Sequence, residues 1–176
     1  MSVCRRPASA LPDSTPPELA RAEVLVPSAE ELQALAARLA RELAPGDFLA
    51  LCGDLGSGKT CFVQGLARGL GVSGRVTSPT FVLLHLHPGT PPLCHLDAYR
   101  VGSAQELLDL GLEEYAETAV VAVEWADRVP EVIPAEALLL TFHWAPAGRR
   151  LELVGRGARP AALVRQLREA DHDPGL

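Results

Sequence analysis

The segment Gly53-Asp-Leu-Gly-Ser-Gly-Lys-Thr60 constrains the fold of this chain more than any other part of its sequence. It matches the pattern G-x-x-x-x-G-K-[ST] and lies between an apolar run at 47–52 and a helical pattern that starts near Lys59. This strand–loop–helix context is the one in which the pattern forms a phosphate-binding loop. The glycines allow a tight turn whose N–H groups point at phosphate oxygens, and the helix N-terminus adds partial positive charge.

Lysine occurs once in the chain, at position 59, although the sequence contains 16 Lys and Arg residues. A lysine ammonium is a compact charge on a flexible stem that reaches the β- and γ-phosphates, where a planar guanidinium would not fit. The Thr60 hydroxyl is a suitable ligand for Mg²⁺. We therefore predict a nucleotide site that uses Mg²⁺. The residues predicted to bind the nucleotide are Gly53, Asp54, Gly56, Ser57, Gly58, Lys59, Thr60 and Cys61.

Helical patterns alternate with buried-strand patterns in the first two-thirds of the chain, and a hairpin pattern follows. Strands are predicted at 23–26, 47–52, within 76–87, and at 93–97, 119–124, 137–144 and 150–156. Helices are predicted from the capping boxes at Ser28 (ending at Pro45-Gly46) and Ser103 (continuing to about Tyr115), and at 59–70 and 160–170. This order predicts an α/β fold, a three-layer sandwich like that of P-loop NTPases, with a mixed, partly parallel sheet and a C-terminal antiparallel hairpin.

The length of 176 residues suits one domain, which we place at residues 22–170. Residues 1–21 are rich in Pro, Ser and Ala and are predicted to be a disordered extension, and 171–176 a flexible tail. A Pro-rich stretch, not an apolar one, follows the arginines at 5 and 6, so we expect no signal peptide and a cytoplasmic location. The four cysteines have no metal-binding spacing and suit a reducing compartment.

The net charge of −6 argues against tight, direct binding of nucleic acid, which needs a cluster of basic residues. The longest apolar stretch, near 137–144, is too short to span a membrane. Neither feature conflicts with a small nucleotide-binding enzyme.

Two acidic residues end predicted strands and are candidates for catalysis. Asp97 ends the run Leu93-Cys-His-Leu-Asp97, and Glu124 ends Val120-Val-Ala-Val-Glu124. Ligands in open α/β sheets bind beyond the carboxyl ends of strands, so either acid could hold Mg²⁺ or orient an attacking water. The alternative is that each acid only begins a turn or caps the next helix.

Three other features carry weaker signals. The segment Thr77-Ser-Pro-Thr80 lies where a switch hydroxyl would sense the γ-phosphate, or it is an ordinary turn. His85 and His87 alternate on a strand but lack a third metal ligand at suitable spacing. Trp125 is either a core residue or a surface anchor for a partner.

Four segments in this order resemble the TsaE family, formerly YjeE: GDLGSGKT, TSPTF, HLDAYR (95–100) and VEWADR (123–128). The resemblance runs from about residue 23 to 156. It implies a small ATPase of tRNA threonylcarbamoyladenosine synthesis that binds ATP and Mg²⁺. The family acts with TsaD and TsaB, which transfer a threonylcarbamoyl group to the adenosine beside the anticodon in tRNAs reading ANN codons. Its ATPase cycle is thought to reset that complex, so tRNA is contacted only indirectly.

By motif match, Lys59 binds phosphate, Thr60 and Glu124 hold Mg²⁺, Asp97 is the Walker-B-like acid and Thr80 is the switch hydroxyl. Asp97, Glu124 and Thr80 are the predicted catalytic set. Switch or partner contacts are assigned to Ser78, Pro79, Tyr99, Arg100 and Trp125. The motifs contain no arginine finger, which predicts slow hydrolysis without partners.

The chain departs from the family pattern at three places. Leu32 stands where the family often has Thr, Cys61 stands where a second hydroxyl is common, and the N-terminal extension has no counterpart. Two alternatives stay open. One is a small-molecule kinase, which usually needs an arginine-bearing lid; Arg149 and Arg150 lie in the C-terminal hairpin, but no lid-like insertion surrounds them. The other is a module that binds nucleotide without hydrolysing it.

Overall fold

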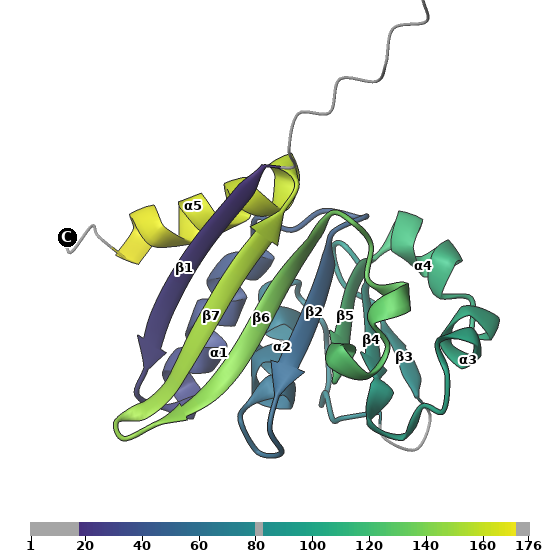
Figure 1. Ribbon diagram of the computed structural model, residues 1–176, viewed down its shortest axis with the longest axis horizontal. Coiled ribbons are helices and arrows are strands. Elements are labelled where there is room, and N and C mark those ends of the chain that lie inside the picture. The colour runs from purple at the N-terminus through teal and green to yellow at the C-terminus, as the bar shows by residue number, and fades with distance from the viewer. Residues whose placement is uncertain (1–17, 80–82, 172–176) are drawn as a thin grey trace, which may run out of the picture.

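The computed structural model describes residues 18–79 and 83–171, which form a seven-stranded mixed sheet between two layers of helices (Figure 1). The strands lie in the order β1-β7-β6-β2-β5-β4-β3. Their bounds are β1 Leu19–Val26, β2 Phe48–Gly53, β3 Leu84–His87, β4 Leu93–Asp97, β5 Val120–Glu124, β6 Ala137–Ala145 and β7 Gly148–Arg156. The four central strands β6, β2, β5 and β4 are parallel, and β3, β7 and β1 add antiparallel edges.

Three helices cover one face of the sheet and two shorter helices cover the other (Figure 1). The first layer contains α1 Ala29–Ala40, α2 Lys59–Gly69 and α5 Ala158–Asp171, and the second α3 Ala104–Asp109 and α4 Leu112–Thr118. Short 3-10 turns follow two of the parallel strands: η1 Ala98–Arg100 comes after β4, and η2 Ala126–Arg128 and η3 Pro130–Val132 come after β5. The predicted three-layer α/β architecture, mixed sheet and C-terminal hairpin are therefore confirmed.

The central strand β2 shows why the sheet is covered on both faces. Leu49 and Leu51 pack against the α1–α2 layer, whereas Phe48 and Ala50 pack against the α3–α4 layer. All four are buried. Successive side chains of a strand point to opposite faces, so an uninterrupted apolar run needs a helix layer on each side.

The register of the parallel strands brings their polar ends together. Asp97 at the end of β4 pairs with Glu124 at the end of β5, and Glu124 pairs in turn with Leu51 of β2. The phosphate-loop segment begins two residues after Leu51, at Gly53. Both acids and this segment therefore lie at one edge of the sheet.

Several element boundaries differ from the sequence predictions. Strand β1 begins at Leu19, not at residue 23, because 19–22 pair with β7; residues 19–21 thus belong to the sheet and not to the extension. Helix α1 ends at Ala40, before the Pro45-Gly46 pair that was expected to stop it. Residues 1–17 and 172–176 lie outside the described part of the chain.

The two predicted capping boxes behave differently. Ser28 accepts a hydrogen bond from the N–H of Glu31 at 3.1 Å, so the first box is confirmed. Ser103 makes no side-chain cap, and the Glu106 carboxylate instead accepts from the N–H of Gly102 at 3.1 Å. The helical structure predicted to about Tyr115 is present as two helices, because Gly111 at φ +83° separates α3 from α4.

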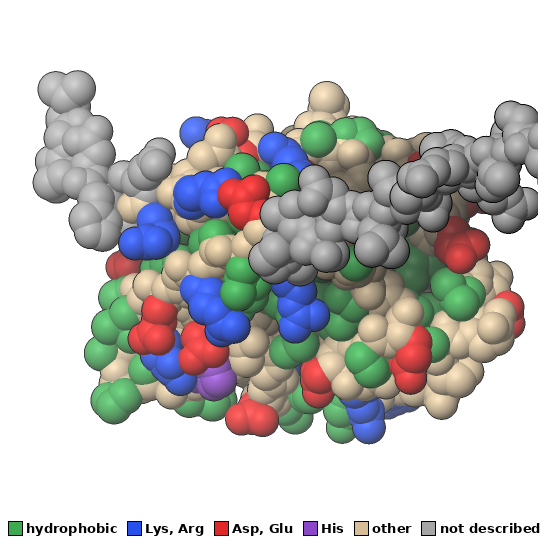
Figure 2. Space-filling view, turned by 45° about the horizontal axis from the view of Figure 1, so that its top comes forward, with side chains coloured by type: hydrophobic (Ala, Val, Ile, Leu, Met, Phe, Trp, Pro, Cys, Tyr) green, Lys and Arg blue, Asp and Glu red, His purple; other side chains and the backbone are tan. Residues whose placement is uncertain are grey.

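The surface carries charges of both signs. On the face shown in Figure 2, basic and acidic side chains are interspersed. Across 18–79 and 83–171, none of the helices is long and apolar enough to cross a membrane.

Candidate functional site

The phosphate-loop segment turns through left-handed backbone conformations between β2 and α2. Gly53 has φ +136° and Gly58 has φ +114°. A Cβ atom at Gly53 would lie 2.5 Å from the Phe142 carbonyl oxygen, and one at Gly58 would lie 2.8 Å from Cδ2 of Leu32. Glycine is required at both positions by conformation and by space.

The N-terminus of α2 has no side-chain cap within this loop. Its N-cap is Gly58, which has no side chain to accept a bond from the first helical N–H groups. Ser57 Oγ is buried and has no hydrogen-bond partner among the described residues. Unpaired donors at a helix start form a site that suits phosphate oxygens, so the residues present fit the predicted ligand.

Lys59 lies across its own loop and is only 4% exposed. Its Nζ donates to the carbonyl oxygens of Gly53 at 2.6 Å and Asp54 at 2.8 Å. The ammonium also lies 3.7 Å from the centroid of the Trp125 ring, a cation–π contact. Burial lowers the pKa of Lys59, and the nearby carboxylates, Glu124 first among them, oppose that shift.

Glu124 joins the sheet to the phosphate loop. It is 2% exposed, and its Oε2 accepts a hydrogen bond of 2.8 Å from the Thr60 hydroxyl. The two predicted metal ligands thus meet, although 64 residues separate them in the chain. A carboxylate and a hydroxyl are the hard oxygen donors that Mg²⁺ prefers, so this pair fits the predicted ion.

The second oxygen of Glu124 contacts a histidine that was not singled out from the sequence. Oε1 lies 2.8 Å from Nε2 of His95, which is fully buried. A carboxylate can only accept, so Nε2 carries the proton in this pair. The signal was present in the sequence: His95 is two residues before Asp97 on one strand, so both side chains point to the same face.

Asp97 is 3% exposed and accepts from two groups. Its Oδ1 accepts from the N–H of Tyr99 at 2.9 Å, and its Oδ2 accepts from the Ser78 hydroxyl at 2.5 Å. Asp97 thus caps the turn η1, as the alternative interpretation expected. It also holds Ser78 at the cavity, and the role of this segment as a switch stays a prediction.

Trp125 directly follows Glu124 in a left-handed conformation, with φ +58°. A side chain other than glycine is rarely held there, and such strain concentrates at functional sites. Its ring lies 4.9 Å from the Tyr99 ring, and Arg128 donates to the Tyr99 carbonyl. Trp125 is partly buried: it packs between Lys59 and Tyr99 and against the apolar cluster under the α3–α4 layer, and its role as an anchor for a partner stays a prediction.

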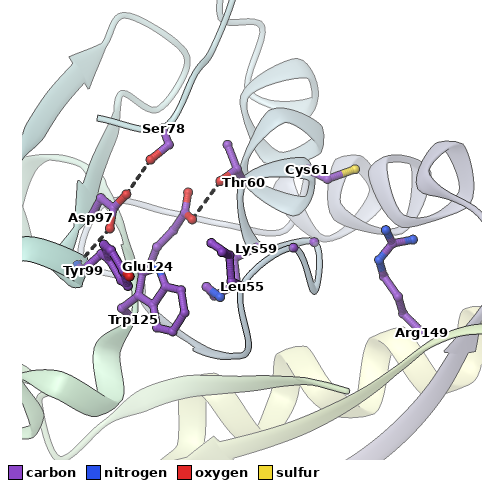
Figure 3. A pocket seen from close by; sticks show the side chains of 12 residues that line it. Leu55, Lys59, Thr60, Cys61, Ser78, Asp97, Tyr99, Glu124, Trp125 and Arg149 are labelled. Carbon is purple, nitrogen blue, oxygen red and sulfur yellow. Dashed lines mark hydrogen bonds between the residues drawn. The ribbon is translucent and has the colours of Figure 1, made fainter. Parts of the chain in front are cut away.

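One cavity of about 440 Å³ connects these groups (Figure 3). It is lined by Leu55, Gly56, Gly58, Lys59, Thr60, Cys61, Ser78, Asp97, Tyr99, Glu124, Trp125 and Arg149. Figure 3 shows the two carboxylates at one end and Arg149 at the other, with the phosphate loop between them.

Arg149 and Leu55 are the two lining residues that were not included among the predicted site residues. Arg149 comes from the β6–β7 hairpin, and its Nε donates to the Ser57 carbonyl at 2.9 Å across 92 residues. In the sequence, Arg149 and Arg150 were considered only for the kinase alternative.

The remaining predicted residues make no hydrogen bond to Glu124 or Asp97 among those described above. Pro79 is buried beside the site and its carbonyl accepts from Leu83 at 2.7 Å, whereas Arg100 is exposed and does not line the cavity. Cys61 lines the cavity, and burial raises the pKa of its thiol. Thr80, the predicted switch hydroxyl, lies outside the described residues.

The histidine pair on β3 forms no metal site. The rings of His85 and His87 lie 5.8 Å apart, and no group of three or more His, Cys, Asp or Glu suited to a metal ion occurs within 18–79 and 83–171.

Comparison with known families agrees with this geometry. A sequence model of the family "Threonylcarbamoyl adenosine biosynthesis protein TsaE" matches residues 26–151, which span the phosphate loop, both acids and Arg149. The chain belongs to the TsaE family. This membership gives it a role in threonylcarbamoyladenosine biosynthesis.

Individual TsaE proteins match over most of their length. The chain is 44% identical to the tRNA threonylcarbamoyladenosine biosynthesis protein TsaE of Streptomyces coelicolor over 137 residues, 73% of this chain and 93% of that protein. It is 40% identical to the TsaE protein of Bacillus subtilis over 146 residues, 81% of this chain and 91% of that protein. The crystal structure of Bacillus subtilis YdiB superposes with a TM-score of 0.71 at 33% identity, covering 90% of this chain and all of that one.

Proposed function

We propose that this TsaE-family chain is a Mg²⁺-dependent ATPase whose cycle supports threonylcarbamoyl transfer to tRNA. TsaD and TsaB would carry out the transfer to the adenosine beside the anticodon in tRNAs reading ANN codons. ATP hydrolysis here would reset the TsaD–TsaB complex between turnovers. The observation that carries the proposal is the Thr60–Glu124 hydrogen bond of 2.8 Å, which connects a phosphate loop to a buried strand-end acid.

The loop residues have distinct tasks in this mechanism. The unpaired N–H groups at the start of α2 bind phosphate oxygens, and Lys59 exchanges its contacts with the Gly53 and Asp54 carbonyls for contacts with phosphate. Because burial already lowers the pKa of Lys59, its ammonium gains more from an anionic partner than an exposed lysine would.

The acids complete the site. Thr60 and Glu124 would hold Mg²⁺, which supplies neutralisation of charge on the β- and γ-phosphates when bound. Asp97 and Glu124 are buried side by side, at adjacent register positions, and each is a candidate to orient the attacking water. Asp97 also accepts a hydrogen bond from Ser78, so a movement of the Ser78 segment would change the position of the Asp97 carboxylate.

The distribution of cations supports dependence on partners. Among the described residues that line the cavity, Lys59 and Arg149 are the basic ones, and Arg149 lies at the end away from the acids (Figure 3). A cation beside the γ-phosphate would then come from a bound protein, which would accelerate a slow basal reaction. The net charge of −6, together with the mixture of acidic and basic side chains on the face shown in Figure 2, favours contact with tRNA through partners.

The test is ATP hydrolysis by the purified protein, alone and with TsaD and TsaB. We expect a slow basal rate that rises when both partners are added. Lys59→Ala should weaken ATP binding, and Glu124→Ala should abolish hydrolysis while the protein remains folded. Release of no phosphate in the assembled complex would instead make the chain a nucleotide-gated binding module. Appearance of a phosphorylated small-molecule acceptor would indicate a kinase.

A further inference from the structure

Strand β1 is an edge strand whose outer side has no partner strand within residues 18–79 and 83–171 (Figure 1). It pairs with β7 through all eight of its residues, in a continuous register without a bulge. The strand at the opposite edge, β3, spans only four residues. Proteins usually protect an edge by shortening it, by placing a proline or a bulge in it, or by covering it. The sequence LARAEVLV of β1 contains no proline, so this edge is able to pair with another strand.

The pairing with β7 determines which backbone groups of β1 point to the outer edge. The N–H of Gly157 donates to the carbonyl of Glu18 at 2.8 Å, directly before the first register pair, Leu19 with Arg156. In an antiparallel pair of strands, residues that exchange hydrogen bonds alternate with residues that do not. The even-numbered residues of β1 therefore bond to β7. The N–H and C=O groups of the odd-numbered residues, from 19 to 25, point outward.

The side chains of β1 also alternate between two environments. The even-numbered side chains pack against the apolar cluster beneath α1, α2 and α5, whereas the odd-numbered ones are exposed on the other face of the sheet. Leu19 is 54% exposed and Leu25 is 55% exposed. Glu23 accepts a hydrogen bond of 3.1 Å from Arg150 of β7, and Arg21 forms no ion pair with a carboxylate among the described residues.

The space beside the end of this edge is not filled. A hollow of about 310 Å³ lies between the last three residues of β1 and helix α1, with Ala34 and Leu35 in its wall. Helix α5 belongs to the layer on the inner face of β1, so it packs on the face of the strand and not beside it. A neighbouring strand could therefore approach the outward backbone groups along the edge.

The sequence of β1 is complementary to itself in one antiparallel register. In a symmetric pair of identical strands, outward residues must face outward residues, so the two-fold axis passes through a residue of the strand. With Ala22 on the axis, Arg21 lies opposite Glu23 of the second copy, and Leu19 lies opposite Leu25 of the second copy. With Arg21 or Glu23 on the axis, that charge would face its own copy, and like charges directly opposite each other are destabilising.

We infer that β1 is a self-association surface, to which a second copy of this chain adds its own β1 antiparallel, with Ala22 on the two-fold axis. The two seven-stranded sheets would then form one continuous sheet. None of the described residues that line the nucleotide cavity belongs to β1, so the inference does not depend on nucleotide binding. A contact made by one pair of short strands is small, so the dimer should be weak and form reversibly as the protein concentration rises.

Sedimentation equilibrium of the full-length protein over a wide concentration range tests the inference, with two charge-reversing variants. Arg21→Glu or Glu23→Arg alone should weaken dimerisation by at least about tenfold, because both symmetry-related pairs then bring like charges together. An equimolar mixture of the two variants should dimerise again, because each mixed pair joins opposite charges. The double variant with both substitutions should also dimerise like the wild type, and its net charge is unchanged.

Glu152→Arg is the matched control. Glu152 lies opposite Glu23 on β7 and contacts the same Arg150, at 2.6 Å, but it lies one strand away from the edge. The variant makes the same change of charge as Glu23→Arg, and we expect it to dimerise like the wild type. The mixture separates lost pairing from lost folding, because a chain that fails to fold is not restored by a second variant.

Four outcomes would overturn the inference. The first is a wild-type protein that stays monomeric at every concentration. The second is a loss of dimerisation in only one of the two single variants, or no recovery in their mixture, which would exclude this register. The third is an equal loss in Glu152→Arg, which would place the contact on the sheet face. The fourth is hydrogen-exchange protection of the Arg21 and Glu23 amides that does not depend on concentration, which would mean that the same chain covers the edge.

Discussion

His95 holds the proposed metal-binding acid Glu124 without lining the cavity itself. Its Nε2 donates to Glu124 Oε1 at 2.8 Å, while Thr60 donates to Glu124 Oε2 at 2.8 Å. The carboxylate is thus fixed from both sides. Its orientation toward the phosphate loop depends on the histidine, so His95 is a positioning residue for Glu124.

Replacement of His95 separates this role from simple packing. We expect His95→Leu to destabilise the protein by about 1–3 kcal/mol, because a buried carboxylate oxygen loses its donor. It should also raise the Mg²⁺ concentration needed for half-maximal ATP binding, measured by titration at fixed ATP. His95→Gln keeps an N–H donor at a similar reach and should restore much of the Mg²⁺ affinity.

His85→Leu is the control for this experiment. His85 faces His95 directly across the β3–β4 pair, but its ring has no hydrogen bond to Glu124. It should leave the Mg²⁺ requirement unchanged. If His95→Leu and His85→Leu shift the Mg²⁺ requirement equally, the hydrogen bond to Glu124 does not position the acid.

At the scale of elements, the close approach of α1 and α2 depends on two glycines of α2, Gly65 and Gly69, that face α1. A Cβ at Gly65 would lie 2.5 Å from the Gln33 carbonyl oxygen and 2.7 Å from Ala36 Cβ, and Gly69 has similar contacts one turn later. Helix α2 carries Lys59 and Thr60 at its N-terminus. The separation of these two helices therefore contributes to where the phosphate-binding groups lie.

Gly65→Ala should raise the helix propensity of α2 but disturb its packing against α1. Alanine favours an isolated helix by about 1 kcal/mol over glycine. Here the added methyl group meets backbone that cannot rotate away, so we expect a net loss of about 1–3 kcal/mol in the free energy of unfolding. Urea denaturation measures it, with Arg68→Ala, an exposed change on the same helix, as the control. An increase in stability would mean that α1 and α2 separate easily.

At the scale of the whole molecule, folding buries Cys94 of β4 beneath the α3–α4 layer and couples the stability of the protein to pH. Burial raises the pKa of the Cys94 thiol from 9.0 to about 12. A raised folded-state pKa contributes stability that is complete below pH 9 and is lost as pH rises toward 12. The loss is about 1.4 kcal/mol per pH unit for one proton.

The comparison of wild type with Cys94→Ala isolates this effect. Between pH 8 and pH 11, urea denaturation should show the wild type losing stability relative to Cys94→Ala. Other groups that titrate in this range, including Cys52 and Cys61, are present in both proteins and cancel. A constant difference between the two proteins across this range would show that the Cys94 thiol titrates normally in the folded state.

The sequence predicted those parts of the fold that depend on local interactions. The loop at 53–60, the buried strands around β2 and β5, and the Ser28 cap each follow from short-range backbone and side-chain preferences. The helical structure predicted from Ser103 to about Tyr115 is present, but the left-handed turn at Gly111, which the pattern did not weigh, divides it into α3 and α4. Strand β1 began earlier than predicted because pairing with β7 extends it.

The sequence by itself determined the phosphate loop, Lys59 within it and the acids that end two strands, because each is encoded in a contiguous segment. Only the tertiary structure decided the contacts between segments: Glu124 with Thr60 and His95, and Arg149 with Ser57. These contacts depend on the strand order β7-β6-β2-β5-β4, which is set by packing of the whole sheet. Local propensities act over a few residues, whereas the 64 and 92 residues that separate these partners are brought together only by burial of the common core.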